Sequence, residues 1–175
     1  MADRPLTGVL LVGGASRRYG SPKALIELDG ETLAERGRRV LAAVCDEVLV
    51  VGKRGELPFD VVDDAADVRA PLAGVVAGLR AARHDVAVCL PVDCPRITPG
   101  LLRLLGDACR DAAVPQTGPL PGAWAKSALP VLEARLAAGG PLALHRTYDV
   151  LDVVTVQVDP ALVADVDTPA DLDTV

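Results

Sequence analysis

Short apolar runs alternate along the chain with segments whose apolar residues recur at helical spacing. The runs at residues 6–12 and 86–92 are continuous, which is typical of strands buried on both faces of a sheet. Shorter runs predict four more strands, and helical spacing predicts helices between the strands. The further strands are expected at residues 48–51, 61–62, 112–114 and 153–158, and the helices at residues 31–44, 71–83, 99–109 and 127–138.

Residues typical of helix ends stand at the borders of these segments. Thr32 and Thr98 can cap the first turn of a helix with their side-chain oxygens, and Pro71 suits a first turn because its missing N–H is not needed there. Gly139 can end a helix in a left-handed conformation, and a last helical turn is expected from Thr168.

Strands that alternate with helices are typical of parallel sheets with helices on both faces. We therefore expect the α/β fold class, with a single doubly wound, mainly parallel, Rossmann-like sheet. No repeat or linker divides the sequence, so one domain is expected over residues 1–175. Residues 116–122 are rich in Gly and Pro and predict a loop.

Composition excludes several classes of protein. A 50% hydrophobic content excludes a disordered chain, and a net charge of −6 argues against a nucleic-acid partner because phosphate-backbone affinity needs clustered cations. No apolar run approaches the roughly 20 residues that span a bilayer, and the N-terminus lacks a signal peptide's pattern. We therefore expect no membrane association and a cytoplasmic location. The scattered cysteines and the two histidines show no metal-site spacing, so reduced, mostly buried thiols are expected.

The loop that follows the first strand has the composition of a phosphate-binding segment. It carries Arg17, Arg18 and Lys23, and no acid occurs between residues 5 and 26 of this acidic chain. Glycines there let the backbone approach phosphate oxygens closely, since a Cβ would block the approach. Neither the dinucleotide fingerprint nor the Walker A pattern fits residues 13–23. An ordinary turn with solvated arginines is the alternative interpretation.

Two carboxylates follow predicted strands directly. Asp64 and Asp93 therefore lie at the carboxyl end of the sheet, where open α/β folds bind ligands. A carboxylate in the position of Asp93 can hold Mg²⁺ against substrate phosphates. The alternative is that Asp93 caps a turn, and the late pair Asp165 and Asp167 can likewise cap the last helix.

Four motifs in order give the chain a family resemblance. They are residues 11–25 (LVGGASRRYGSPKAL), 70–74 (APLAG), 90–95 (LPVDCP) and 165–169 (DVDTP). Together they resemble the nucleotidyltransferases that transfer a nucleoside monophosphate from a triphosphate, and the chain is most similar to the molybdenum cofactor guanylyltransferases. The resemblance covers nearly the whole chain.

The resemblance implies an activity and a set of site residues. The activity is transfer of GMP from GTP to a molybdopterin-type cofactor, by in-line attack on the α-phosphorus with loss of diphosphate. It further implies Mg²⁺ held by Asp93 and Asp167, and transient contacts with enzymes that deliver or receive the cofactor. The implied catalytic residues are Arg17, Lys23 and Asp93, and the implied nucleotide-binding residues are Leu11, Val12, Gly13, Gly14, Ser16, Lys23, Asp64 and Asp93.

Some positions depart from the family pattern. Val51 stands where relatives can place Asn, Ala70 replaces a usual Gly, and Pro22 stands where the guanylyl subgroup commonly has an acid. The segment at residues 116–128 is shorter than the acceptor side of such enzymes, and Trp124 within it is expected to pack in the core rather than stack on a pterin. A cytidylyl- or sugar-phosphate nucleotidyltransferase, or a nucleotide-binding module without turnover, therefore remains an alternative.

Overall fold

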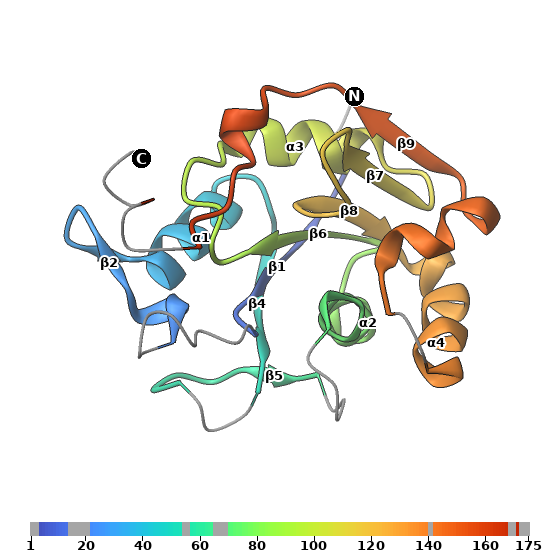
Figure 1. Cartoon of the computed structure of the whole chain (residues 1–175), viewed down its shortest axis with the longest axis horizontal. Helices are drawn as coiled ribbons and strands as arrows, with labels where there is room; N and C mark the ends of the chain where they lie inside the picture. The colour runs from blue at the N-terminus through green and yellow to red at the C-terminus, as the bar shows by residue number, and fades with distance from the viewer. Residues whose placement is uncertain are drawn as a thin grey trace.

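A seven-stranded sheet with helices on both faces forms the framework of the structure, a computed structural model (Figure 1). The described residues are 4–13, 22–53, 57–64, 70–139, 142–167 and 171. The strand order is β5-β4-β1-β6-β8-β7-β9. In chain order these strands are β1 (Thr7–Leu11), β4 (Glu47–Gly52), β5 (Val62–Asp63), β6 (Val86–Pro91), β7 (Ala112–Pro115), β8 (Gly122–Ala125) and β9 (Val153–Val156).

The predicted doubly wound, mainly parallel sheet is confirmed. Strand β1 pairs in parallel with β4 and β6, β4 with β5, and β7 with β9. Strand β8 runs antiparallel to both of its neighbours, β6 and β7. The expected strand and helix bounds agree with the observed ones to within a few residues, apart from the elements discussed next.

Strand β8 was missed by the sequence analysis. Four small or aromatic residues, Gly122–Ala125, directly follow a segment rich in Gly and Pro, so no alternating apolar pattern marks them. The strand forms because both of its neighbours offer a free edge, with Ala87 of β6 and Ala112 of β7 each opposite Trp124.

The first predicted helix begins two residues later than expected. Glu31 and Thr32 form strand β3 (Glu31–Thr32), which pairs with β2 (Glu27–Leu28) as a small hairpin. Helix α1 (Leu33–Ala42) follows, and Thr32 is its N-cap as predicted, because its Oγ1 accepts from the Glu35 N–H while the Glu35 carboxylate accepts from the Thr32 N–H.

Helices cover the two faces of the sheet in pairs. Helices α1 and α3 (Pro99–Ala108) lie on one face, and α2 (Pro71–Ala81) and α4 (Leu129–Ala138) lie on the other (Figure 1). Alternate residues of each central strand point to the two cores: Leu10 of β1 packs under α1, and Val9 packs under α2. Thr98 caps α3, Pro71 opens α2, and Gly139 ends α4 at φ +67°, as predicted.

The side chains expected in the core lie there. Trp124 is fully buried among apolar side chains, with its ring centroid 6.5 Å from that of Tyr148, so its predicted packing role is confirmed. The four cysteines are unpaired, and Cys45 is half-buried whereas the others are buried. The predicted last helical turn from Thr168 lies outside the described residues. Across the residues placed by the structure, no helix has both the length and the apolar character needed to cross a bilayer.

Candidate functional site

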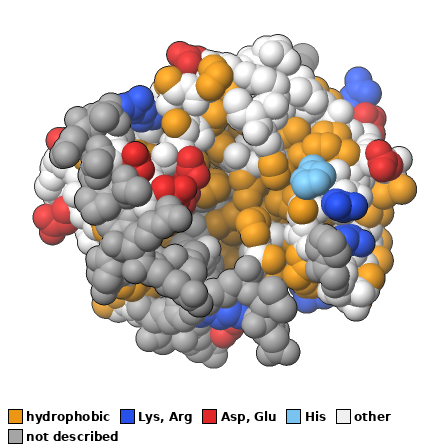
Figure 2. All heavy atoms as spheres, in the orientation of Figure 1, with side chains coloured by type: hydrophobic (Ala, Val, Ile, Leu, Met, Phe, Trp, Pro, Cys, Tyr) orange, Lys and Arg blue, Asp and Glu red, His pale blue; other side chains and the backbone are white. Residues whose placement is uncertain are grey.

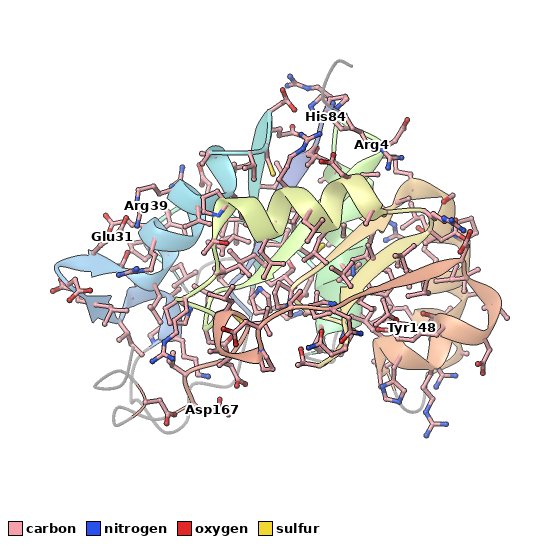
Figure 3. All side chains as sticks on the ribbon, turned by 90° about the horizontal axis from the view of Figure 1, so that it is seen from above. Arg4, Glu31, Arg39, His84, Tyr148 and Asp167 are labelled. Carbon is pink, nitrogen blue, oxygen red and sulfur yellow. The ribbon has the colours of Figure 1, made fainter. Side chains whose placement is uncertain are left out.

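A large cleft opens where the parallel strands end. Its volume is about 1310 Å³, and its lining includes residues that follow β1, β4, β5 and β6. Because these strands are parallel, their carboxyl ends meet at one edge of the sheet. Figure 3 shows Asp167 at this edge, on the side of the molecule opposite His84, which precedes β6. The cleft therefore occupies the place where open α/β sheets bind ligands.

Lys23 joins two carboxylates at one end of the cleft. Its Nζ donates to Asp93 Oδ2 at 3.0 Å and to Asp167 Oδ1 at 2.8 Å. The lysine side chain is 15% exposed, so its charge requires partners of opposite sign. Three residues that were predicted as site residues from separate motifs are thus brought into contact.

Backbone contacts bring the late motif to Asp93. The Val166 N–H donates to the Asp93 carbonyl at 2.8 Å, and the Cys94 thiol donates to the Val163 carbonyl at 3.7 Å. Val163 and Val166 are buried in the core beneath α1 and α3. These contacts hold the segment at residues 163–167 against Asp93 and Cys94, and Asp165 of this segment lines the cleft.

Asp93, Asp165 and Asp167 form a carboxylate cluster. One oxygen from each lies within 4.8 Å of the others. Three carboxylate oxygens at this separation suit a hard divalent cation such as Mg²⁺, which prefers oxygen ligands. Since the Lys23 ammonium already lies against two members of the cluster, this point in the cleft favours positive charge.

The surroundings of the carboxylate cluster shift the pKa values of Lys23 and Cys94. Burial lowers the pKa of Lys23, but the hydrogen bonds to Asp167 and Asp93 outweigh it and raise the pKa above its usual value. The adjacent thiol of Cys94 behaves differently, since burial and then the charge of Asp93 raise its pKa. Both effects favour the neutral thiol form of Cys94, which is a poorer nucleophile than the thiolate.

The end of strand β1 forms the floor of the cleft. Leu11, Val12 and Gly13, for which nucleotide binding remains a prediction, line the cleft, and an added Cβ at Gly13 would meet none of the described atoms within 4 Å. Glycines on neighbouring elements allow close packing here, because a Cβ at Gly52 would lie 2.7 Å from Val12 Cγ2. Among the atoms that the structure describes, none therefore covers the backbone at Gly13.

A second lysine–aspartate pair lies at the ends of β4 and β5. Lys53 Nζ donates to Asp64 Oδ1 at 2.5 Å, and both residues line the cleft. Asp64 was predicted as a nucleotide-binding residue, but Lys53 was missed by the sequence analysis. The available signal was a pair of basic residues, Lys53 and Arg54, placed directly after an apolar strand and its terminal glycine, Gly52.

The other half of the cleft is mostly apolar. Its lining comes from the turn at residues 117–120, the end of α4, and residues 142–145 at the start of the 3-10 segment Leu144–Val150. Figure 2 shows an apolar depression with acidic side chains on one side and a histidine and basic side chains on the other. The cleft thus has a charged half and an apolar half.

The structure does not describe three of the predicted site residues. Gly14, Ser16 and Arg17 lie outside the described residues. Their expected roles in binding phosphates therefore remain predictions.

Comparison with known proteins decides the family. The model of the MobA-like NTP transferase domain matches residues 8–154 of this chain. The chain belongs to the MobA-like NTP transferase family. A molybdenum cofactor guanylyltransferase of Pseudomonas putida (strain GB-1) is 36% identical over 149 residues, which cover 77% of this chain and 78% of that protein. This MobA-like chain therefore carries a nucleotidyltransferase domain.

Solved structures share the fold. Molybdopterin-guanine dinucleotide biosynthesis protein A from Archaeoglobus fulgidus has a TM-score of 0.79 and 23% identity, covering 96% of this chain and 95% of that one. A Mycobacterium tuberculosis protein solved as a complex with manganese has a TM-score of 0.65 and 22% identity, with 97% of each chain covered. The α/β architecture is thus that of MobA-like nucleotidyltransferases.

Proposed function

We propose that this chain transfers GMP from GTP to a molybdopterin-type cofactor and releases diphosphate. The observation that carries the proposal is the bridging of Asp93 and Asp167 by Lys23 at the carboxyl edge of the sheet, within a cleft that has room for two ligands. The support for GTP and for this acceptor is the name of the 36%-identical relative.

The charged half of the cleft would hold the triphosphate. Lys23 and the backbone of Gly13 both line the cleft, and an ammonium and an N–H group are both suited to bind phosphate oxygens. Arg17 is proposed to contact the same phosphates from the loop that precedes Lys23. A ligand with several negative charges is otherwise repelled by the carboxylate cluster, which makes these cations necessary.

The carboxylate cluster fits a divalent cation, which we propose to be Mg²⁺ held by Asp93 and Asp167, with Asp165 close by. A cation there supplies charge neutralisation on the phosphate oxygens. The manganese complex of the structurally similar Mycobacterium tuberculosis protein is consistent with a metal on this fold.

The reaction requires alignment rather than a covalent nucleophile from the protein. A terminal phosphate oxygen of the acceptor attacks the α-phosphorus of GTP, and the bond from that phosphorus to the bridging oxygen of diphosphate breaks. The apolar half of the cleft, near Leu120 and Leu142, would hold the ring system of the acceptor so that its phosphate points toward Lys23. Lys23 stabilises the charge that develops on the transferred group.

A transfer assay tests the proposal. Incubation with radiolabelled GTP, Mg²⁺ and molybdopterin should yield the dinucleotide and diphosphate, and EDTA should abolish the product. The Asp93→Asn variant should lose about 10²–10³-fold in rate, because it weakens the hold on the cation that would neutralise transition-state charge. Asp152→Asn is the matched control, because Asp152 pairs with Arg110 on the surface and does not line the cleft. Transfer of CMP from CTP instead of GMP from GTP would refute the base assignment.

A further inference from the structure

Strand β9 forms one edge of the seven-stranded sheet, at the end opposite β5 (Figure 1). It pairs in parallel with β7 on one side, and in the described part of the chain no strand pairs with its other side. The chain is also extended just before and just after the strand, at Leu151 (φ −120°, ψ 148°) and Asp159 (φ −64°, ψ 118°). We call residues 151–159 the β9 edge.

The β9 edge lacks the features that keep the edges of most sheets from pairing. Native proteins commonly place charged residues, prolines or bulges on an edge strand. Residues 153–158 (VVTVQV) contain no charged residue and no proline, and the register of β7 against β9 runs without a bulge. Valine and threonine are also enriched in strands. The β9 edge is therefore suited to accept a further strand.

The backbone groups of the β9 edge alternate between the sheet and the open side. The Val156 carbonyl accepts from the Gln116 N–H at 3.2 Å. The Gln116 side chain accepts from the Val158 N–H at 2.9 Å and donates to the Val158 carbonyl at 2.8 Å. Since these groups alternate in direction along a strand, the odd-numbered residues turn theirs away from β7. These residues are Val153, Thr155 and Gln157.

Apolar side chains beside the β9 edge are left partly uncovered. Val150, three residues before β9, is 69% exposed, and Leu104 of α3 is 50% exposed. Helix α3 contacts β9, and Leu104 lies on the side of α3 toward it. The opposite side of this helix carries Gly106, where a Cβ would lie 2.6 Å from Leu6 Cδ1 next to β1. A partner that extended the sheet here would remove apolar surface from water, which favours association.

We propose that a second copy of this chain binds the β9 edge, so that two β9 strands pair in antiparallel orientation about a twofold axis at Thr155. A twofold dimer places the same surface of both copies in contact, and antiparallel strands pair through residues whose backbone groups point outward. With Thr155 opposite its own copy, Val153 lies opposite Gln157. Threonine pairs on neighbouring strands are favourable, and Thr155 is exposed and available for one.

The distribution of charge favours a second copy in this register. Asp152 and Asp159 are the charged residues of the β9 edge, and they lie opposite Val158 and Leu151 of the other copy. Like charges are therefore not placed directly opposite each other, which would be destabilising. Asp152 is also paired with Arg110 at 3.2 Å. Two copies that each carry a net charge of −6 can thus meet along an uncharged segment.

The dimer goes beyond the proposed function and does not depend on it. The residues of β9 do not line the cleft, and Thr155 lies outside the site at the ends of β1 and β6. A substitution at Thr155 can therefore change the association of two copies without changing the residues of the cleft.

Sedimentation equilibrium of the full chain, from about 1 µM to about 1 mM, tests the dimer. Wild type should shift from the monomer mass to twice that mass as its concentration rises. Thr155→Lys should weaken this dimer at least about tenfold, because two ammonium groups would face each other across the axis. Thr155→Asp should weaken it in the same way. An equimolar mixture of the two variants should restore the dimer, since the substituted side chains then carry opposite charges.

Ala42→Lys is the matched control, because it adds the same charge at an exposed position of α1, which packs over β1 and β4. This variant should dimerise like wild type. Restoration by mixing cannot arise from unfolding, so the test holds even if one variant is less stable. A wild type that stays monomeric at about 1 mM would overturn the inference and favour a strand of another protein as the occupant. Dimers that persist in Thr155→Lys, or that mixing does not restore, would also overturn it.

Discussion

Lys23 Nζ lies 3.0 Å from Asp93 Oδ2, although 70 residues separate them in the sequence. The same ammonium lies 2.8 Å from Asp167, so one positive charge holds together two carboxylates of the cluster that fits a metal ion. A divalent cation that binds these oxygens must compete with the lysine or move it. Binding of the cation would then release the Lys23 ammonium from these two carboxylates.

Replacing Lys23 should therefore strengthen metal binding by the nucleotide-free protein. In Lys23→Met, the affinity for Mn²⁺ should rise about tenfold, because a competing charge within about 4 Å of the ligand oxygens is removed in a partly exposed site. The rate of transfer should fall at the same time. Paramagnetic resonance of Mn²⁺ measures the free ion directly, and Lys126→Met, a substitution of a lysine outside the cleft, is the control. Weaker Mn²⁺ binding by Lys23→Met would contradict the competition.

Glycine at position 78 sets the distance between α2 and the sheet. A Cβ there would lie 2.7 Å from Val9 Cγ1, and valine is stiff at χ1, so the helix would have to shift. Gly78→Ala should lower the free energy of unfolding by about 1–3 kcal/mol, as overpacking does. Urea denaturation followed by circular dichroism measures the change.

Gly100 provides the contrast, because a Cβ there meets none of the described atoms within 4 Å and the residue is exposed near the start of α3. Gly100→Ala should be neutral or stabilise the protein by up to about 1 kcal/mol through helix propensity. If Gly78→Ala and Gly100→Ala destabilised the protein equally, the loss of stability would come from backbone conformation and not from the contact with Val9.

Trp124 is fully buried on strand β8 and packs against the apolar side chains beneath α2 and α4. Trp124→Ala should cost about 3–5 kcal/mol in the free energy of unfolding, because it removes a large buried side chain and leaves a cavity. Leu104→Ala, on the exposed side of α3 at 50% exposure, should change stability by less than about 0.5 kcal/mol. A similar small effect for Trp124→Ala would contradict the placement of β8 between β6 and β7.

The buried thiols predict a loss of stability in alkali. Burial raises the pKa of Cys109 to about 12, from an ordinary value of 9.0. The folded state therefore holds this proton more tightly than the unfolded state does, so stability that is present below pH 9 is lost as the pH rises toward 12. Burial and the charge of Asp46 raise the pKa of Cys45 to about 12 as well, in the same direction.

Urea midpoints measured in reducing buffer between about pH 9 and about pH 11 should fall with pH, and the slope should become shallower in Cys109→Ala by up to about 1.4 kcal/mol per pH unit. Other groups titrate in this range, so the comparison between variant and parent isolates the thiol. An identical slope in the two proteins would show that Cys109 ionises equally in the folded and unfolded states.

The sequence by itself determined the doubly wound α/β class, because continuous apolar runs and helical periodicity record which residues must leave water. It also determined the caps at Thr32 and Thr98, since capping depends on residues only three positions apart. Asp64, Asp93 and Lys23 could be predicted as site residues because each stands at a strand end or in a loop of distinctive composition. These are local properties of the chain.

Only the tertiary structure decided what those residues touch. Lys23 can bridge Asp93 and Asp167 because a backbone hydrogen bond from Val166 to Asp93 holds the late segment beside β6. The pairing of Lys53 with Asp64 depends on the register of β4 against β5. Strand β8 exists because two open sheet edges accept it, not because its four residues favour a strand. These contacts join residues that are separated in the sequence. A local pattern of hydrophobicity or charge therefore cannot predict which residue contacts which.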